Sequence, residues 1–218
     1  MRPHVSYSEI SSFANGCQWR WKLDYLDNLR SENFSVHFDF GTAVHEAVER
    51  HYTRKDPLDI PAAVKIFEEK FEELVELNGS KYKDPLSKKD KQSMLVSGAT
   101  IIRCLKMTPE LQDVEVIHNE FPLFEEIGHE HPIKFKGFID IVLKGKDKRG
   151  NTILWIGDFK TCSWGWDRDT RADRWKHYQL FLYKHFLCKK FDIDPKNVRT
   201  AFILLKKRPP KGSGPVEF

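Results

Sequence analysis

The chain has 218 residues, of which 40% are apolar and 13% aromatic, which is enough to bury a domain core and excludes global disorder. Lys and Arg number 36 against 32 Asp and Glu, and this net charge of +4 permits a nucleic-acid partner without requiring one. The N-terminus lacks an apolar segment, and no apolar run reaches the roughly 18 residues of a membrane span. The four cysteines form no C-x-x-C pair, which favours reduced thiols. We therefore expect a cytoplasmic protein without a membrane segment.

Apolar residues recur with helical spacing through the first half of the chain. Residues 7–26 predict a short helix followed by an aromatic-rich one. Another helix is expected to begin near Thr42, a residue type suited to an N-cap. Two more are expected, one over 61–79 and one beginning at Ser87, where Asp90 completes an approximate capping box.

In the second half the period changes to that of strands. Strands are expected over 114–124, 133–145, 152–161 and 198–207, with a polar turn at 146–151 and a helix over 173–191. This order predicts an α/β fold in which helices flank a short mixed sheet. We expect one domain over 1–218, made of a mainly helical part (1–110), a β-β-β-α-β core (111–207) and an irregular tail (208–218).

Two carboxylates stand where an apolar strand has little use for them. Asp140 interrupts "GFIDIVL", and Asp158 ends the apolar run "ILWIG". A buried acid without a partner is costly, so such acids tend to be paired or to bind a metal. Lys160 lies two residues after Asp158 and shares its strand face, while Phe159 points into the core. A hairpin through 146–151 brings Asp140 close to Asp158.

This set of side chains has a chemical logic. Two carboxylates hold Mg²⁺ or Mn²⁺ in an oxygen-rich site that keeps positions open for water and phosphate. A lysine beside them orients or deprotonates the attacking water, or neutralises the charge that develops on the phosphate. The alternative is that both acids are strand-end residues and that Asp158 and Lys160 form an ordinary surface ion pair.

The motif "GFID", followed 18 residues after its aspartate by the aspartate of "GDFKT", resembles the motif pair of PD-(D/E)XK nucleases. The finer resemblance is to their RecB-like branch, which includes bacterial recombination nucleases, phage exonucleases and CRISPR-associated adaptation nucleases. It covers roughly residues 5–207, and four further motifs follow the order of the branch: "SYSEISSFANGCQWRWKLDYL", "GTAVHEAVE", "HNEFPL" and "YQLFLY".

The resemblance implies a restriction-endonuclease-like αβββαβ core with an N-terminal helical addition, and it assigns roles to particular residues. The implied catalytic residues are Asp140, Asp158, Lys160, Gln179 and Tyr183. The implied metal ligands are His45, Asp140, Asp158 and the backbone carbonyl of Phe159, with Glu120 as a strand acid that assists them. The implied cofactor is Mg²⁺ or Mn²⁺.

One feature of the branch has no full counterpart in the chain. Many members hold an iron–sulfur cluster with one N-terminal and three C-terminal cysteines. Cys17 stands near the N-terminal position, but the C-terminal trio is missing. Either the chain is a cluster-free member or it is a fragment of a longer protein, and for the chain as given we expect no iron–sulfur cluster.

Other interpretations of these residues stay open. His45 alone, in a first helical turn, is more often structural or exposed than a ligand. Glu120 is equally a solvated strand residue. Gln179 and Tyr183 are spaced i, i+4 and share a helix face, which is also typical of a core stripe with one polar member.

Two basic stretches are candidates for DNA contacts. In residues 161–177, two tryptophans suit stacking on bases and three arginines suit phosphate contacts: Trp164, Trp166, Arg168, Arg171 and Arg174. The alternative is a solvated charged loop with packed tryptophans. The segment "KKRPPK" over 206–211 is a second candidate for phosphate contact.

The sequence thus predicts a divalent-metal-dependent DNA nuclease, an exonuclease in recombination, repair or phage DNA processing. Its expected partner is DNA, at ends or in single strands, and a homo-oligomer or a recombination partner protein stays open. The alternatives are a CRISPR-type adaptation nuclease, an inactive nucleic-acid-binding module of the same fold, or an unrelated metal-binding or structural α/β domain.

Overall fold

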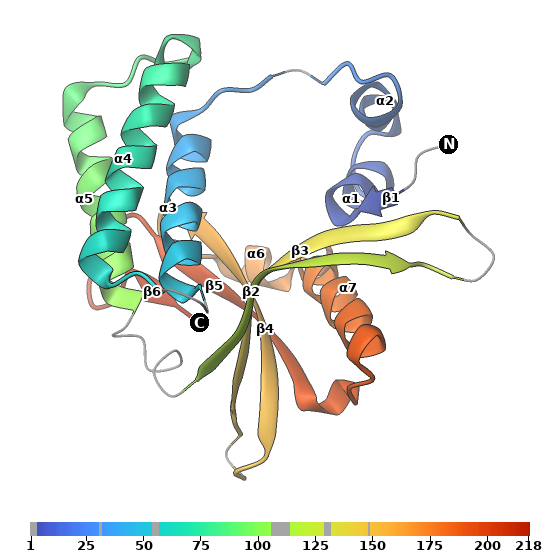
Figure 1. Ribbon diagram of the computed structural model, residues 1–218. Helices are drawn as coiled ribbons and strands as arrows, with labels where there is room; N and C mark the ends of the chain where they lie inside the picture. The colour runs from blue at the N-terminus through green and yellow to red at the C-terminus, as the bar shows by residue number, and fades with distance from the viewer. Residues whose placement is uncertain (1–3, 31, 54–56, 106–113, 129–131, 148) are drawn as a thin grey trace.

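The computed structural model describes residues 4–30, 32–53, 57–105, 114–128, 132–147 and 149–218. It has the expected fold class, a mixed sheet flanked by helices (Figure 1). The strands are β1 (His4–Ser6), β2 (Glu115–Glu126), β3 (Lys134–Lys146), β4 (Thr152–Cys162), β5 (Val198–Lys206) and β6 (Val216–Glu217). No helix in these ranges is long and apolar enough to cross a membrane.

Most helices in the described ranges come before β2, and the others lie between β4 and β5. Before β2 come α1 (Tyr7–Ala14), α2 (Gln18–Trp21), η1 (Lys22–Leu26), α3 (Val36–Tyr52), α4 (Ile60–Asn78), η2 (Gly79–Lys81) and α5 (Lys88–Cys104). Between β4 and β5 come α6 (Arg168–Ala172), α7 (Arg174–Phe191) and η5 (Pro195–Asn197). The boundary expected at 110–111, and Lys148 of the expected turn, lie outside the described residues.

The sheet has the order β1-β3-β4-β5-β6, with β2 on the other edge of β3. β3 runs antiparallel to β2 and β4 and parallel to β1, whereas β4 and β5 are parallel. A parallel pair needs a crossover, and α6 and α7 supply it between β4 and β5. Along one edge of β3, β1 covers Lys134–Lys136 and β4 covers Ile141–Lys146, so the two neighbours diverge over 137–140.

Helices cover both faces of the sheet and make two cores (Figure 1). On one face α3, α4 and α5 pack over Ile141, Phe159 and Ile203. On the other face α7 packs over Ile139 and Ile156. The catalytic candidates on β3 and β4 therefore lie between two helical layers.

The structure corrects the expected start of α3. The helix begins at Val36 with Ser35 as its N-cap, and the Ser35 hydroxyl accepts from the backbone N–H of His37 at 3.3 Å. Thr42 is inside the helix, where its hydroxyl donates to the carbonyl of Phe38 at 3.1 Å instead of capping. The sequence around Gly41 resembles a break because glycine weakens isolated helices, but here the residue packs against the sheet at Thr161.

The expected helix from Ser87 is confirmed, since the Ser87 hydroxyl accepts from the N–H of Asp90 at 3.1 Å. The tail that was expected to be irregular contains one short strand, because Val216–Glu217 of β6 pair antiparallel with β5. Buried Lys206 explains the pairing: its ammonium group reaches Glu217 of β6 at 3.1 Å. β1 was not expected either, because its three residues are too short to show a strand period.

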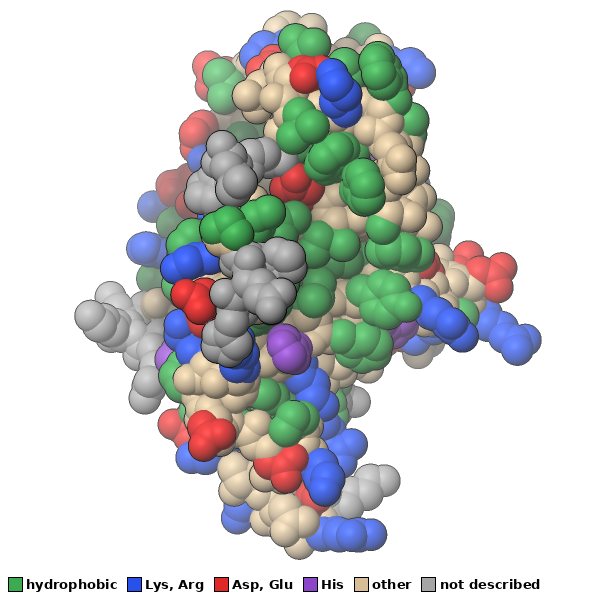
Figure 2. Space-filling view, turned by 90° about the vertical axis from the view of Figure 1, so that its right-hand side faces the viewer, with side chains coloured by type: hydrophobic (Ala, Val, Ile, Leu, Met, Phe, Trp, Pro, Cys, Tyr) green, Lys and Arg blue, Asp and Glu red, His purple; other side chains and the backbone are tan. Residues whose placement is uncertain are grey.

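Apolar side chains remain exposed on the N-terminal helices. Trp19 of α2 and Leu29 after η1 are each 67% exposed. Figure 2 looks at the side on which α1, α2 and the β2–β3 hairpin lie in Figure 1, and hydrophobic side chains gather over its upper half. The described part of the chain leaves this surface uncovered.

Candidate active site

The two strand aspartates lie across from each other where β3 and β4 separate. The last paired residues of these strands are Ile141 and Gly157, and one step further the register sets Asp140 opposite Asp158. At Gly157 a side chain would clash, because an added Cβ would lie 2.7 Å from Ile141. Beyond that point Asp140 Oδ2 accepts from the backbone N–H of Phe159 at 2.7 Å, so the carboxylate bridges the two strands.

At Asp140 both β2 and β3 twist, so that alternate side chains change from one face of the sheet to the other. Ile139 packs under α7, but Ile141, two residues on, packs under α3, although residues two apart share a face in a regular strand. β2 changes face in the same place: Phe121 packs under α7, and Asn119 donates to α3. Between them Glu120 has φ 46°, a conformation that is costly for a residue with a side chain. The distortion is therefore concentrated at the two acids of these strands.

Asp158 is 1% exposed and its two oxygens differ. Oδ1 accepts from the Gln179 amide at 2.9 Å. Oδ2 forms an ion pair with Lys160 Nζ at 2.8 Å but has no hydrogen bond. Among the buried side-chain oxygens and nitrogens of the described residues, Oδ2 is the one without a hydrogen-bond partner. A buried carboxylate oxygen left in this state is suited to accept a cation.

Gln179 and Tyr183 come to the site from α7. The Gln179 amide lies 3.1 Å from the Tyr183 hydroxyl and 2.9 Å from Asp158, so it links the tyrosine to the carboxylate. The Tyr183 ring lies directly on β3 at Gly137, where an added Cβ would be 2.7 Å from it. Tyr183 is buried in the core, as in a core stripe, whereas Gln179 contacts the aspartate, and a catalytic role for the pair stays a prediction.

His45 reaches the site from the opposite helical layer. It lies one turn after Gly41 on α3, and its Nδ1 is 3.9 Å from Asp140 Oδ2. Burial lowers the pKa of His45, although the charge of Asp158 and the backbone carbonyl of Phe159 act in the other direction. A neutral imidazole of this kind retains a lone pair for a metal.

Burial dominates the electrostatics of the carboxylates. It raises the pKa of Asp140 to about 8, assisted by the charge of Asp158, while the N–H of Phe159 opposes the shift. Burial also raises the pKa of Asp158, against the neighbouring Lys160. The pKa of Glu120 is raised by burial and by the charges of Glu49 and Asp158. Three acids thus share one site with too little positive charge to hold them all ionised.

This donor set fits a hard divalent cation. In the described ranges no group of three or more His, Cys, Asp or Glu side chains is placed so that it could hold a metal ion by itself. Mg²⁺ does not need one, because it is commonly held by one or two carboxylates plus water and substrate phosphate. Asp140, Asp158 and the neutral His45, together with the Phe159 carbonyl, offer that partial set. The buried Oδ2 of Asp158, which has an ion pair with Lys160 but no hydrogen bond, is the observation on which the fit rests.

A protein-family model described as the PD-(D/E)XK nuclease superfamily matches residues 4–217. The chain belongs to this superfamily. A search of curated proteins found no match. For a PD-(D/E)XK nuclease the implied activity is cleavage of phosphodiester bonds in a nucleic acid, which agrees with a site that gathers carboxylates and a lysine at one strand separation.

The basic segment after β4 is divided between exposed and structural residues. Trp164 is 60% exposed, and Arg168 and Arg174 are exposed. Trp166 instead packs on Phe202, with ring centroids 4.7 Å apart. Arg171 is engaged internally, since it pairs with Glu217 and donates to the carbonyl of Trp166 at 2.9 Å.

One residue near the site was missed from the sequence. The hydroxyl of Tyr7 on α1 donates to the carbonyl of Trp175 on α7. Burial raises the pKa of Tyr7, and the charges of Lys160 and Asp158 also act on it. Tyr7 lies within the quoted N-terminal motif, but no spacing rule links it to strands more than a hundred residues away.

Proposed function

We propose that the protein is a divalent-metal-dependent DNA nuclease that acts as an exonuclease. The observation that carries the proposal is the buried Oδ2 of Asp158, which has no hydrogen bond and lies beside Asp140 and the ammonium group of Lys160, 2.8 Å away. A purely structural ion pair would satisfy both oxygens of a carboxylate buried this deeply. Membership of the PD-(D/E)XK superfamily supports hydrolysis of phosphodiesters as the reaction.

Four groups are proposed to hold Mg²⁺ or Mn²⁺: the carboxylates of Asp140 and Asp158, the His45 imidazole and the Phe159 carbonyl. When bound, the cation supplies Lewis-acid activation of water and phosphate. The hydrogen bond from the Phe159 N–H fixes Asp140, and the Gln179 amide fixes Asp158. Glu120 is a carboxylate neighbour that strengthens the negative potential of the site.

Lys160 is assigned the role of the catalytic cation. Its side chain is 37% exposed, so it borders both Asp158 and solvent, where a phosphate would approach. In that position it orients the attacking water or stabilises negative charge on the phosphate. Gln179 and Tyr183 are positioning residues, because they act through Asp158.

DNA is proposed to approach past the segment that follows β4. Trp164 suits stacking on a base, and Arg168 and Arg174 suit phosphates because they are exposed. Arg171 and Trp166 are better explained as supports of that segment, given their internal contacts. The RecB-like motif order favours single strands or ends as substrate, in recombination, repair or phage DNA processing.

Cleavage of end-labelled linear DNA and closed circular single-stranded DNA, with Mg²⁺ and with Mn²⁺, tests the proposal. We expect cation-dependent shortening of the linear DNA from its ends, an intact circle, and no product in excess EDTA. Cleavage in EDTA would contradict the metal mechanism. Cutting of the circle would contradict exonuclease action, and DNA binding without cleavage under any cation would favour an inactive binding module.

A further inference from the structure

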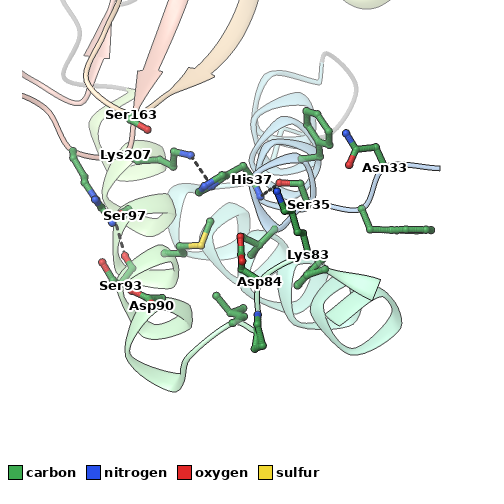
Figure 3. Close-up of a pocket in the computed structure, with 18 residues that line it drawn as sticks. Asn33, Ser35, His37, Lys83, Asp84, Asp90, Ser93, Ser97, Ser163 and Lys207 are labelled. Atoms are coloured by element: carbon green, nitrogen blue, oxygen red, sulfur yellow. Dashed lines mark hydrogen bonds between the residues drawn. The ribbon is translucent and has the colours of Figure 1, made fainter. Parts of the chain in front are cut away.

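A cavity of about 570 Å³ opens at the N-terminal end of α3 (Figure 3). None of its lining residues has a role in the proposed catalytic centre. It lies between the N-terminal end of α3, the start of α5, the segment 82–86 and the residues that follow β4 and β5. Its size falls within the range of sites that enclose small organic ligands. Polar groups from all four segments line it, so it is suited to a ligand with several hydrogen-bonding groups.

One end of the cavity gathers positive charge. Lys207 Nζ lies 3.2 Å from His37 Nδ1, and Arg208 lines the same wall. Across the described ranges none of the three forms an ion pair with a carboxylate. Burial and the two neighbouring cations lower the pKa of His37, and burial also lowers the pKa of Lys207. Lys207 and Arg208 are two cations without a counter-charge, which favours an anion beside them, and a neutral His37 contributes hydrogen bonding rather than charge.

The opposite end has acceptors instead. Figure 3 shows Lys207 and Ser163 at the upper end of the view and the two carboxylates below them, Asp84 below His37 and next to Lys83, and Asp90 beside Ser93. Carboxylates repel a phosphate but accept from amino groups, such as those on the edges of nucleobases. Apolar side chains, among them Phe34, Tyr82 and Met94, lie along the cavity as well. The lining is thus divided into a part for an anion and a part for a flat group with N–H donors.

The cavity and the catalytic centre lie on the same helix. His37 borders the cavity and His45 borders Asp140, and eight residues of helix separate them by about 12 Å. The residues that follow β4 and β5 also link the cavity to the catalytic centre. The N–H of Arg208 donates to the carbonyl of Ser163 at 2.8 Å, and Ser163 lies three residues beyond Lys160. A nucleic-acid strand at Lys160 would reach the basic end within a few nucleotides. Arg208 also lies 6.0 Å from the ring of exposed Trp164.

We propose that the cavity binds the terminal nucleotide of the substrate strand, with its phosphate against His37, Lys207 and Arg208 and its base toward Asp84 and Asp90. The inference rests on the proposed nuclease function and gives it a means of recognising an end. A strand that continued through the cavity would carry its next phosphate to the acidic end, so an internal nucleotide does not fit. Neither end of the cavity involves a group assigned to the metal.

Calorimetric titration of the metal-free protein in EDTA tests the site without the reaction. The probes are deoxyadenosine 5′-monophosphate, deoxyadenosine and inorganic phosphate. We expect saturable one-site binding of the mononucleotide, with the nucleoside and phosphate each weaker by at least about tenfold. Equal binding of phosphate and mononucleotide would contradict a base site, and the absence of mononucleotide binding would overturn the proposal.

Two variants test the two parts of the cavity separately. The double change Lys207→Met and Arg208→Met removes positive charge, and Asp84→Ala removes a carboxylate acceptor from an exposed position in the segment 82–86, which leaves the core intact. Each should weaken mononucleotide binding by at least about tenfold. The control is Lys196→Met on η5, outside the cavity, which should bind normally. If both variants melt like the unaltered chain and bind like it, the proposal is wrong.

Competition separates an end from an internal segment. Added before the mononucleotide, a linear single-stranded oligonucleotide should block its binding, and a circular one of the same sequence should not. Blocking by the circle would overturn the terminal assignment. Failure of the pocket is distinguishable from failure of the nuclease: a chain that cleaves DNA but binds no mononucleotide loses only the pocket. One that binds the mononucleotide but cleaves nothing loses the proposed activity.

Discussion

Two neighbouring strands each bury one charged side chain, and the two charges differ in how completely nearby groups satisfy them. Lys206 on β5 is 2% exposed, and its ammonium group is matched by the Glu217 carboxylate at 3.1 Å and the Ser213 hydroxyl at 2.5 Å. Asp158 on β4 is 1% exposed, yet one of its oxygens has no hydrogen bond and a second acid lies opposite.

The difference separates a structural charge from one kept for a ligand. Burying an ion costs several kcal/mol unless partners compensate, and around Lys206 the chain supplies them by adding β6 to the sheet. Around Asp158 it supplies Lys160 and Gln179 but sets a second acid opposite, and the charge of Asp158 makes ionisation of that acid, Asp140, more costly. A cation from solution would remove that cost. Neutralising an acid of the catalytic pair should therefore raise stability and lower activity, whereas neutralising the partner of Lys206 should lower stability.

The largest expected effect is on turnover. Asp140→Asn keeps the shape of the side chain and removes its charge, so a proposed metal ligand is lost. Turnover on DNA should fall by about three orders of magnitude, equivalent to about 4 kcal/mol of barrier. Initial rates on end-labelled DNA at saturating Mn²⁺ measure it. A variant that kept more than about a tenth of the rate would show that the site is misplaced.

Lys160→Met should cost somewhat less, about two to three orders of magnitude in single-turnover cleavage, because a charge partner is lost and the metal ligands stay. Metal affinity, measured by calorimetry, should be nearly unchanged. Lys144→Met is the matched control, since Lys144 forms an exposed ion pair with Glu115 at 3.3 Å. Equal cleavage by the two variants would make Lys160 a surface ion-pair residue.

Metal-free stability should fall as the pH rises. The pKa of Asp140 is 3.8 in an ordinary setting and about 8 in the fold, so unfolding releases a proton between these values. The contribution is therefore favourable at low pH and is lost as the pH rises toward 8. In EDTA, Asp140→Asn should melt several degrees above the unaltered chain at pH 8, and the gap should shrink at pH 5. A gap that is independent of pH would contradict a raised pKa.

The smallest effect concerns the structural charge. Glu217→Gln leaves Lys206 buried beside a neutral amide, and the unfolding free energy should fall by about 1–2 kcal/mol, because Glu217 itself is partly exposed. The loss should be the same with and without Mg²⁺, as denaturant titration can show. A loss that Mg²⁺ reverses would place Lys206 in the metal site rather than in the fold.

The sequence predicted what depends on short spacing. Asp158 and Lys160 share a strand face because they are two residues apart, and the hairpin register brings Asp140 opposite. The capping box at Ser87 and Asp90 is equally local. These features arise from geometry within one element or one tight connection, which the pattern of residues carries directly.

What the sequence did not predict depends on distant partners. Nothing in "HNEFPL" indicates the positive φ of Glu120, which follows from both strands turning from one helical layer to the other. Gly41 and Thr42 resemble a helix start until Thr161 is seen packed against Gly41. The cavity behind His37 and Lys207 joins segments 170 residues apart. In each case packing overrides local preference.

Asp158 gives the most direct test of the central claim, that a buried carboxylate is left unsatisfied for a cation. Thermal melting of the unaltered chain and of Asp158→Asn, in EDTA and in Mn²⁺, measures stability and binding together. We predict that Asp158→Asn melts above the unaltered chain in EDTA and that Mn²⁺ raises the melting temperature of the unaltered chain alone. A variant that melts lower in EDTA and is still stabilised by Mn²⁺ would contradict the claim.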